Sequence, residues 1–256
     1  MKVHFIQHED FEAPGAYLQW ALARHHKTSF SKVYQYEALP QDGTMIDFLV
    51  IMGGPQSPDS SQQEYPYYDA RAEIALIRQC IHAGKAVVGV CLGSQLIGEA
   101  LGATYEPSPE KEIGVFGIQL TQDGLADPKV GHFGEFLPVG HWHNDMPGLS
   151  LASQVLAVSA GCPRQIVRYT DLVYGFQCHM ELNAEVVELL IQAETDLLHK
   201  SKLHKFVQTP DQIRSYDYTE MNNKLFQFLD QLEIAYQHTK TIFRTDRSNP
   251  NPVPQP

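Results

Sequence analysis

The stretch AVVGVCLGSQLIGEALG, residues 86–102, combines two patterns of hydrophobicity around a single cysteine. Its first five residues are small or apolar, as in a buried strand, whereas the apolar residues after Cys91 recur every three or four positions. That second spacing predicts a helix, and Gly102 is suited to the left-handed conformation that ends one. A buried strand followed by a tight turn and a helix is typical of α/β proteins with mostly parallel sheets.

The rest of the chain repeats this alternation of short apolar runs and longer helical patterns. Helices are expected over residues 16–25, near 74–83 and from 184 to about 199, with Asn183 as N-cap of the third. Strands are expected at residues 3–7, 47–52, 86–90, 115–120, 154–158, 165–169 and 172–177. We therefore expect a mostly parallel open sheet flanked by helices.

Composition limits the classes of function. The 256 residues are 43% hydrophobic and carry 19 basic against 30 acidic side chains, a net charge of −11. Such a chain has no basic field with which to bind nucleic acid or an anionic membrane surface. The first residues are too briefly apolar for a signal peptide, and four cysteines without a C-x-x-C pair fit a reducing compartment, so a cytoplasmic location is expected.

The C-terminal part reads differently from the rest. Residues 1–200 are expected to form the main domain and residues 201–245 a helical extension, with an amphipathic helix over 219–237. Residues 246–256 are rich in proline and polar side chains and are expected to be disordered.

Cys91 is the first candidate for chemistry. It lies between Gly89 and Gly93 at the predicted junction of strand and helix, where glycines leave room for the sharp turn of a nucleophile elbow. A helix N-terminus beside the sulfur favours the thiolate, which is the nucleophilic form. The alternative is a small buried hydrophobic cysteine without reactivity.

His179 and Glu181 are candidates for the base and its partner. They follow a predicted strand two positions apart, so both side chains lie on one side if the chain stays extended. His179 can then accept the thiol proton while Glu181 orients its ring. The alternative is a histidine and a glutamate that merely lie at a strand end.

The turn Gly53-Gly54-Pro55 follows the predicted strand at 47–52. Backbone without side chains can approach a substrate closely and direct amide groups at a developing oxyanion. With the two previous motifs, three strand ends now carry a nucleophile, a base pair and amide donors, and ligands of open α/β sheets bind at such ends.

At this point the sequence resembles the class I glutamine amidotransferases over about residues 45–182. Its motifs are most similar to free-standing proteins that resemble the amidotransferase domain of GMP synthase. The resemblance is carried by MGGPQS at 52–57, GVCLGSQLIGEALGA at 89–103, WHND at 142–145, GCPRQ at 161–165 and VYGFQCHMEL at 173–182.

The resemblance implies specific roles. Cys91 would be the nucleophile and His179 and Glu181 the rest of the triad. The amides of Leu92 and of the Gly53-Gly54 turn, preferably Gly54, would form the oxyanion hole. Gln95, like Gly53, would contact the bound substrate.

Two departures from the family pattern concern shape and partners. Cys178 and Met180 flank His179 where the family has an aromatic residue and a proline, so the histidine loop is expected to differ in shape. The roughly 70 residues after 182 are too few for an ATP-using synthetase domain. A separate synthetase subunit is therefore one alternative for a partner.

A metal site at His141, His143 and Asp145 is another alternative, since these side chains are ordinary zinc ligands. No third well-placed ligand is evident from the sequence, so neither a metal nor a cofactor is expected.

The predicted function is thiol-dependent hydrolysis of the amide of glutamine or another small γ-glutamyl compound. The alternatives are a non-catalytic binding or regulatory module on the same fold, a subunit that supplies ammonia to a partner, and a related cysteine-elbow peptidase or stress-response thiol.

Overall fold

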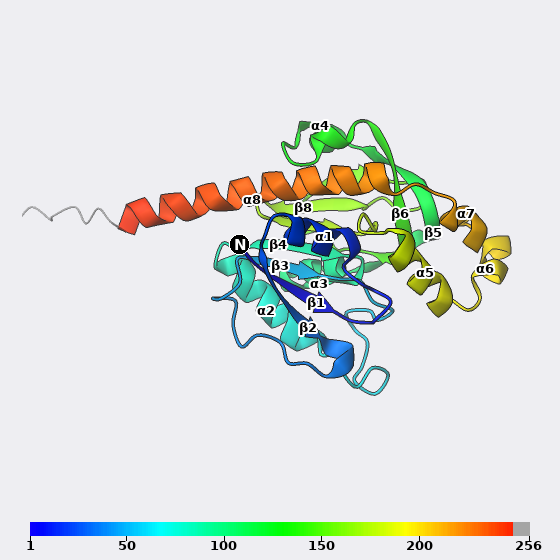
Figure 1. Ribbon diagram of the computed structural model, residues 1–256, viewed down its shortest axis with the longest axis horizontal. Helices are drawn as coiled ribbons and strands as arrows, with labels where there is room; N and C mark the ends of the chain where they lie inside the picture. Colours follow the sequence, from blue (N-terminus) through cyan, green and yellow to red (C-terminus); the bar gives the residue numbers. More distant parts are fainter. Residues whose placement is uncertain (248–256) are drawn as a thin grey trace, which may run out of the picture.

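The apolar runs predicted as strands lie beside one another in one sheet, which the computed structural model describes within residues 1–247 (Figure 1). Five strands form its parallel part in the order β2-β1-β3-β4-β9. These strands are β1 (Lys2–Gln7), β2 (Lys27–Lys32), β3 (Phe48–Ile51), β4 (Ala86–Val90) and β9 (Val173–Phe176). Strands β3, β4 and β9 are buried throughout, as expected of strands covered on both faces.

The sheet continues beyond β9 as β8-β7-β5-β10, and β6 pairs with β5. Pairs β9–β8, β8–β7, β7–β5 and β5–β6 are antiparallel, whereas the short β10 runs parallel to β5. The bounds are β5 (Glu106–Leu120), β6 (Phe136–Met146), β7 (Gln154–Val158), β8 (Ile166–Thr170) and β10 (Phe206–Val207). The predicted α/β class with a mostly parallel central sheet is confirmed.

Helices cover both faces of the parallel part. On one face α1 (Gly15–Ala23) packs beside α8 (Thr219–Arg247), and α5 (Ala184–Ala193) contributes to the same hydrophobic core. On the other face α2 (Ala70–His82) packs against α3 (Leu92–Ala100) over a second core. Three short helices, α4 (Gln122–Ala126), α6 (Leu197–Leu203) and α7 (Pro210–Arg214), and two 3₁₀ turns at Val33–Gln35 and Gly131–Phe133 complete the described elements.

Local signals set the helix ends where they were expected. The Asn183 side chain accepts a hydrogen bond from the Val186 amide at 3.0 Å and so caps α5. Gly84 and Gly102, with φ of +65° and +78°, follow α2 and α3 in the left-handed conformation.

Some sequence-based boundaries were wrong. The single helix predicted from residue 184 to about 199 is divided into α5 and α6, because the chain leaves helical geometry at Glu194. Strands β2 and β6 were missed, and α8 extends ten residues past the predicted end at Gln237. Strand β2 is polar and is the last strand of the sheet, so it carries little hydrophobic signal.

The predicted C-terminal segment contains the long α8, whose apolar side belongs to the same core as the sheet. Its last turns extend beyond the body of the protein (Figure 1). Of the tail predicted at 246–256, residues 246 and 247 end α8, and the others lie outside the described residues. Within the described part, no helix has the length and apolarity required to cross a bilayer.

Candidate active site

Cys91 occupies the sharp turn between β4 and α3, in a backbone conformation of φ 49° and ψ −109°. Such a positive φ is strained for a residue with a side chain and persists only where the surroundings enforce it. Here the Cys91 amide donates a 2.7 Å hydrogen bond to the Phe176 carbonyl of β9. The turn also needs its flanking glycines, since a Cβ on Gly89 would lie 2.2 Å from the Gly93 carbonyl oxygen.

His179 and Glu181 lie beyond the end of β9 and face the same interior region. The His179 amide donates to the Gly140 carbonyl at 2.8 Å, which fixes the histidine loop to β6. The ring Nδ1 lies 2.6 Å from Glu181 Oε1, and both side chains are buried. The other ring nitrogen, Nε2, has no hydrogen-bond partner within the standard distance and angle limits among the described residues. Cys91 is the neighbour with which this nitrogen can exchange a proton.

The charges of these three residues are coupled. Burial disfavours a charged His179, but Glu181 and Cys91 outweigh that effect and raise the pKa of His179 well above its usual value. Burial raises the pKa of the Cys91 thiol, while His179 and the Leu92 amide act in the opposite direction. The Leu92 amide at the helix start thus favours the thiolate, as expected, and His179 acts in the same direction against burial.

The Gly53-Gly54 turn follows β3 and packs against the start of α3. A Cβ on Gly54 would lie 3.1 Å from Leu92 Cδ2, which places this glycine beside the first residue of the helix. The Gly53 carbonyl accepts a 3.0 Å hydrogen bond from Nδ1 of the buried His8, whose Nε2 lies 2.9 Å from Glu73. The turn is thus held from behind by a buried histidine that the sequence analysis did not identify.

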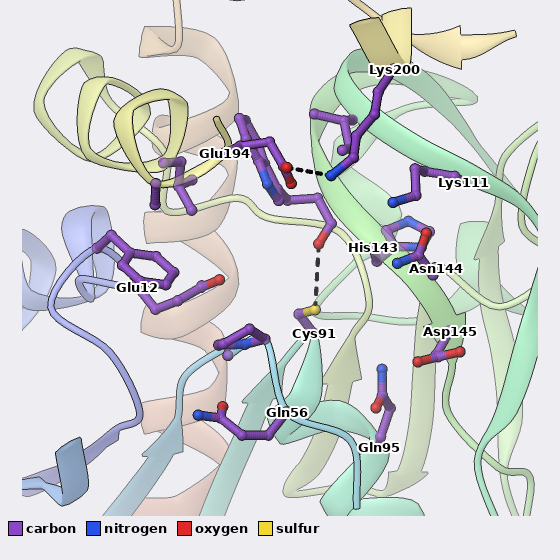
Figure 2. Close-up of a pocket in the computed structure, with 17 residues that line it drawn as sticks. Glu12, Gln56, Cys91, Gln95, Lys111, His143, Asn144, Asp145, Glu194 and Lys200 are labelled. Carbon is purple, nitrogen blue, oxygen red and sulfur yellow. Dashed lines mark hydrogen bonds and ion pairs between the residues drawn. The ribbon is translucent and has the colours of Figure 1, made fainter. Parts of the chain in front are cut away.

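Cys91 opens onto a cavity of about 300 Å³ (Figure 2). Its sulfur points toward the Trp142 carbonyl at 3.7 Å. Gln95 lies one helical turn beyond Cys91 and lines the same cavity, with its Nε2 3.3 Å from Gln177 Oε1. The remaining lining residues are polar and apolar in similar numbers: Glu12, Gln56, Lys111, His143, Asn144, Asp145, Glu194 and Lys200, with Phe11, Gly54, Pro55, Ile113, Trp142, Leu190 and Ala193.

Glu12 is a site residue that sequence reasoning missed. It comes from the loop between β1 and α1, is only 6% exposed and lines the cavity beside Cys91. Burial raises the pKa of Glu12 to about 7, although the His179 charge acts in the opposite direction. No motif around HEDFEAP indicates this position, because the loop approaches Cys91 only through the folding of the sheet.

Lys111 and Asp145 add opposite charges to the cavity wall from β5 and β6. Burial lowers the pKa of Lys111 and raises that of Asp145, so each is partly removed from solvent. Cys178, by contrast, points away from this chemistry, since its thiol is fully buried and directed at the Gln165 carbonyl at 3.7 Å.

A thiol beside an imidazole, which is in turn oriented by a carboxylate, can attack a carbonyl carbon and form a covalent acyl intermediate. The structure places Cys91, Gly54 and Gln95 on the wall of one cavity, and His179, Glu181 and Leu92 lie next to them outside its lining.

Comparisons with known proteins find similar sequences and structures over most of this chain. The family profile of "Glutamine amidotransferase class-I" matches residues 17–191. A glutamine amidotransferase-like protein of Salmonella typhimurium, YfeJ, is 53% identical over 92% of this chain and 99% of its own length. The crystal structure of SMU.1228c superposes with a TM-score of 0.90 at 52% identity and covers 91% of this chain and 100% of that one. The GMP synthase of Phenylobacterium zucineum is 24% identical over 66% of this chain but only 32% of its own length.

Proposed function

The chain belongs to the class I glutamine amidotransferase family, and we propose that it hydrolyses the side-chain amide of glutamine or of another γ-glutamyl compound through a thioester on Cys91. The main support for this proposal is structural. Cys91 interacts with His179, and His179 interacts with Glu181, so that three buried side chains are connected at the edge of a substrate-sized cavity.

In the first step the Cys91 thiol gives its proton to Nε2 of His179 as the sulfur attacks the amide carbon. The carbonyl oxygen becomes an oxyanion, for which the amides of Leu92 and Gly54 are the proposed donors. When the tetrahedral intermediate collapses, the C–N bond breaks and His179 returns the proton to the leaving amine.

The second step releases the acid. Water attacks the Cys91 thioester and transfers a proton to His179, the C–S bond breaks, and the sulfur regains a proton from the imidazolium. Glutamate leaves and the resting site is restored. Glu181 keeps the His179 ring in one tautomer throughout and stabilises its positive charge, without taking the proton itself.

The polar wall supports an amino-acid substrate. Asp145 offers a carboxylate and Lys111 an ammonium group, and glutamine carries the complementary α-ammonium and α-carboxylate. Gln95 adds an amide between Cys91 and this wall (Figure 2). Such groups fix the orientation of the substrate, while Cys91 acts on the far end of its side chain.

The leaving group decides between two versions of this activity. A site dedicated to glutamine can close around ammonia, whereas a γ-glutamyl peptide hydrolase must accommodate a larger amine. GMP synthase from P. zucineum is glutamine-hydrolysing by name and is about three times as long as the region that this chain matches. We favour the hydrolase that acts without a partner, and we keep ammonia supply to a synthetase as the alternative.

The test measures glutamate release by the purified chain from glutamine and from γ-glutamyl dipeptides, without ATP. Cys91→Ala serves as the blank, and Cys162→Ala as the matched control, since that buried cysteine lies outside the cavity. We expect release from at least one substrate with the control and none above background with Cys91→Ala.

A diazoketone analogue of glutamine gives a second readout. It should add one label to the protein, and peptide mapping should place that label on Cys91. Labelling without turnover would indicate activation by a partner. Neither labelling nor turnover would leave the non-catalytic binding module as the better description.

A further inference from the structure

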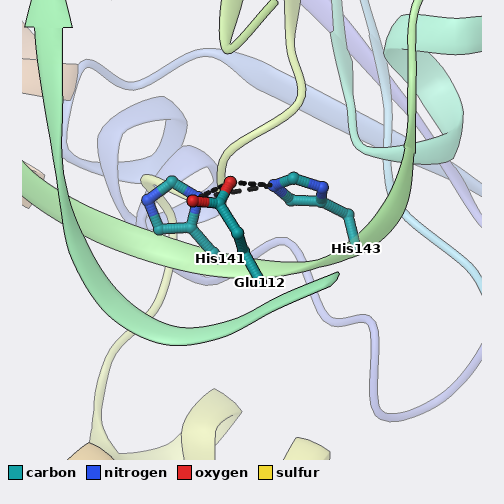
Figure 3. Close-up of side chains that lie close together, drawn as sticks. All are labelled: Glu112, His141 and His143. Atoms are coloured by element: carbon teal, nitrogen blue, oxygen red, sulfur yellow. Dashed lines mark hydrogen bonds and ion pairs between the residues drawn. The ribbon is translucent and has the colours of Figure 1, made fainter. Parts of the chain in front are cut away.

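Glu112, His141 and His143 form a buried cluster beside the cavity, which His143 also lines (Figure 3). The two histidines are two positions apart on β6, so the alternation of the strand places them on one face. Glu112 reaches the same point from β5, where it is paired in register with His143. Glu112 is the third residue that spacing along the sequence does not indicate, whereas Asp145 lines the cavity and is not part of the cluster.

The three potential ligand atoms form a nearly equilateral triangle. His141 Nδ1 lies 3.4 Å from His143 Nε2, and Glu112 Oε2 lies 3.6 Å and 3.3 Å from these two nitrogens. A tetrahedral Zn²⁺ ion with bonds of about 2.0–2.1 Å holds its ligand atoms about 3.3–3.4 Å apart. The spacing of the cluster therefore matches that of a zinc coordination sphere.

The surrounding hydrogen bonds orient these atoms. His141 Nε2 donates to the Phe116 carbonyl at 3.3 Å, so its Nδ1 presents a lone pair to the cluster. Ser159 Oγ lies 2.8 Å from each oxygen of Glu112 and holds the carboxylate in place. Partners of this kind fix ligand orientation in metal sites.

Glu112 has no lysine or arginine partner among the described side chains. Among the described side chains, the only ion pairs of Glu112 are with His141 and His143. Ser159 and Gln165 also donate hydrogen bonds to this carboxylate, and a metal ion bound here would add a full positive charge beside it.

We propose that Glu112, His141 and His143 bind one divalent transition-metal ion, with Zn²⁺ as the ion that fits their spacing and ligand types. Gln165 supplies a fourth position, since its amide nitrogen lies 3.2 Å from His143 Nε2 and 2.6 Å from Glu112 Oε2. Its Oε1 has no hydrogen-bond partner among the described residues. Rotation of the amide by half a turn brings that oxygen to the cluster.

The ion has a structural role. It connects β5 to β6 directly behind Trp142, whose carbonyl accepts the hydrogen bond from Cys91. The metal ion takes part in no step of the proposed hydrolysis. The metal site and the proposed function can therefore be tested independently of each other.

The test uses the full chain with Cys91→Ser, so that the cavity thiol cannot bind the metal. Chelator-treated protein is equilibrated by dialysis against ZnCl₂, and bound zinc is measured by mass spectrometry. We expect about one equivalent per chain, and a rise in Tm on addition of zinc because the ion binds the folded state. Glu112→Gln and His143→Gln should each abolish both effects. His132→Gln, at a partly buried histidine outside the cluster, should leave both unchanged.

Cobalt provides a readout that does not depend on the folding of a variant. Co²⁺ added to the same Cys91→Ser protein should produce the visible absorption of a tetrahedral nitrogen and oxygen site, which zinc then displaces. The proposal is overturned if the protein takes up no zinc or cobalt, or if uptake is the same in Glu112→Gln and His143→Gln. The cluster would then be a hydrogen-bonded network that shares a proton.

Discussion

At the scale of single residues, the Cys91 thiol is subject to opposing effects from burial and from its neighbours. Its burial raises the pKa of the thiol, and this effect outweighs the stabilisation by the Leu92 amide. Reactivity then depends on His179, which can accept the proton as the sulfur attacks. Glu181 matters through the ring that it orients rather than through contact with substrate.

This division of roles predicts a ranking of two variants. His179→Ala removes the proton acceptor and should lower kcat/KM by about 10⁶-fold, whereas Glu181→Gln leaves the imidazole in place and should lower it by about 10⁴-fold. Steady-state kinetics on the best γ-glutamyl substrate measures the ranking, and circular dichroism checks that both variants fold. Equal losses would show that Glu181 takes a direct part in proton transfer.

Glu12 predicts a pH-dependent contribution to stability. Its pKa is about 7 in the folded protein against 4.5 ordinarily, so between these values the folded state binds more protons than the unfolded state. The free energy of unfolding therefore falls as pH rises through this window, by up to about 3 kcal/mol.

Glu12→Gln removes this loss. Relative to the unsubstituted protein, the variant should gain about 1–3 kcal/mol between pH 5 and pH 8 in urea unfolding. Glu135→Gln, at an exposed position, is the control and should show no such gain. A constant difference between Glu12→Gln and the unsubstituted protein at the two pH values would contradict the raised pKa.

At the scale of elements, the β4–α3 junction depends on close backbone contact. Gly89 lies against Gly93, and a Cβ on Gly93 would in turn lie 2.2 Å from the Ile51 carbonyl oxygen of β3. The obstacles are backbone atoms rather than flexible side chains, so they cannot move without shifting α3 or β3. The same contacts hold Cys91 in its strained conformation.

Gly89→Ala should therefore destabilise the protein by at least about 2–3 kcal/mol, because the new methyl group meets the Gly93 carbonyl. Gly84→Ala is the matched control, since nothing lies within 4 Å of that position and only its φ of +65° opposes a side chain. The control substitution should lower the free energy of unfolding by about 1–2 kcal/mol. Chemical denaturation measures both, and a smaller loss for Gly89→Ala than for Gly84→Ala would refute the close-contact explanation.

At the scale of the whole molecule, α8 completes the core on one face of the sheet. Phe228 is fully buried, and its ring centroid lies 5.1 Å from that of Tyr174 and 4.9 Å from that of Phe176. Both partners belong to β9, the strand that leads into the histidine loop. The C-terminal helix thus supports the strand that carries His179 toward Cys91.

Phe228→Ala should lower the free energy of unfolding by about 3–5 kcal/mol, since it leaves a cavity between α8 and β9. Ile234→Ala lies on the same helix at a side chain 48% exposed and should cost less than about 1 kcal/mol. Equal, small effects in urea unfolding would mean that α8 is not an integral part of the core.

The sequence by itself determined the features that depend on neighbours along the chain. Strand β4 and the junction at Cys91 follow from the change in hydrophobic spacing there, and Asn183 and Gly102 mark helix ends through local hydrogen bonding and backbone freedom. The α/β class and the candidate residues Cys91 and His179 could be predicted for the same reason, because short-range patterns and motifs carry them.

Only the tertiary structure decided which distant residues share a site. Glu12 reaches the cavity from the loop after β1, and Glu112 joins His141 and His143 through the pairing of β5 with β6. Strand β6 gave no alternating signal, since its buried positions include histidines as well as apolar residues. Contacts of this kind, and the pKa values that follow from burial, depend on long-range packing, which local spacing in a sequence does not encode.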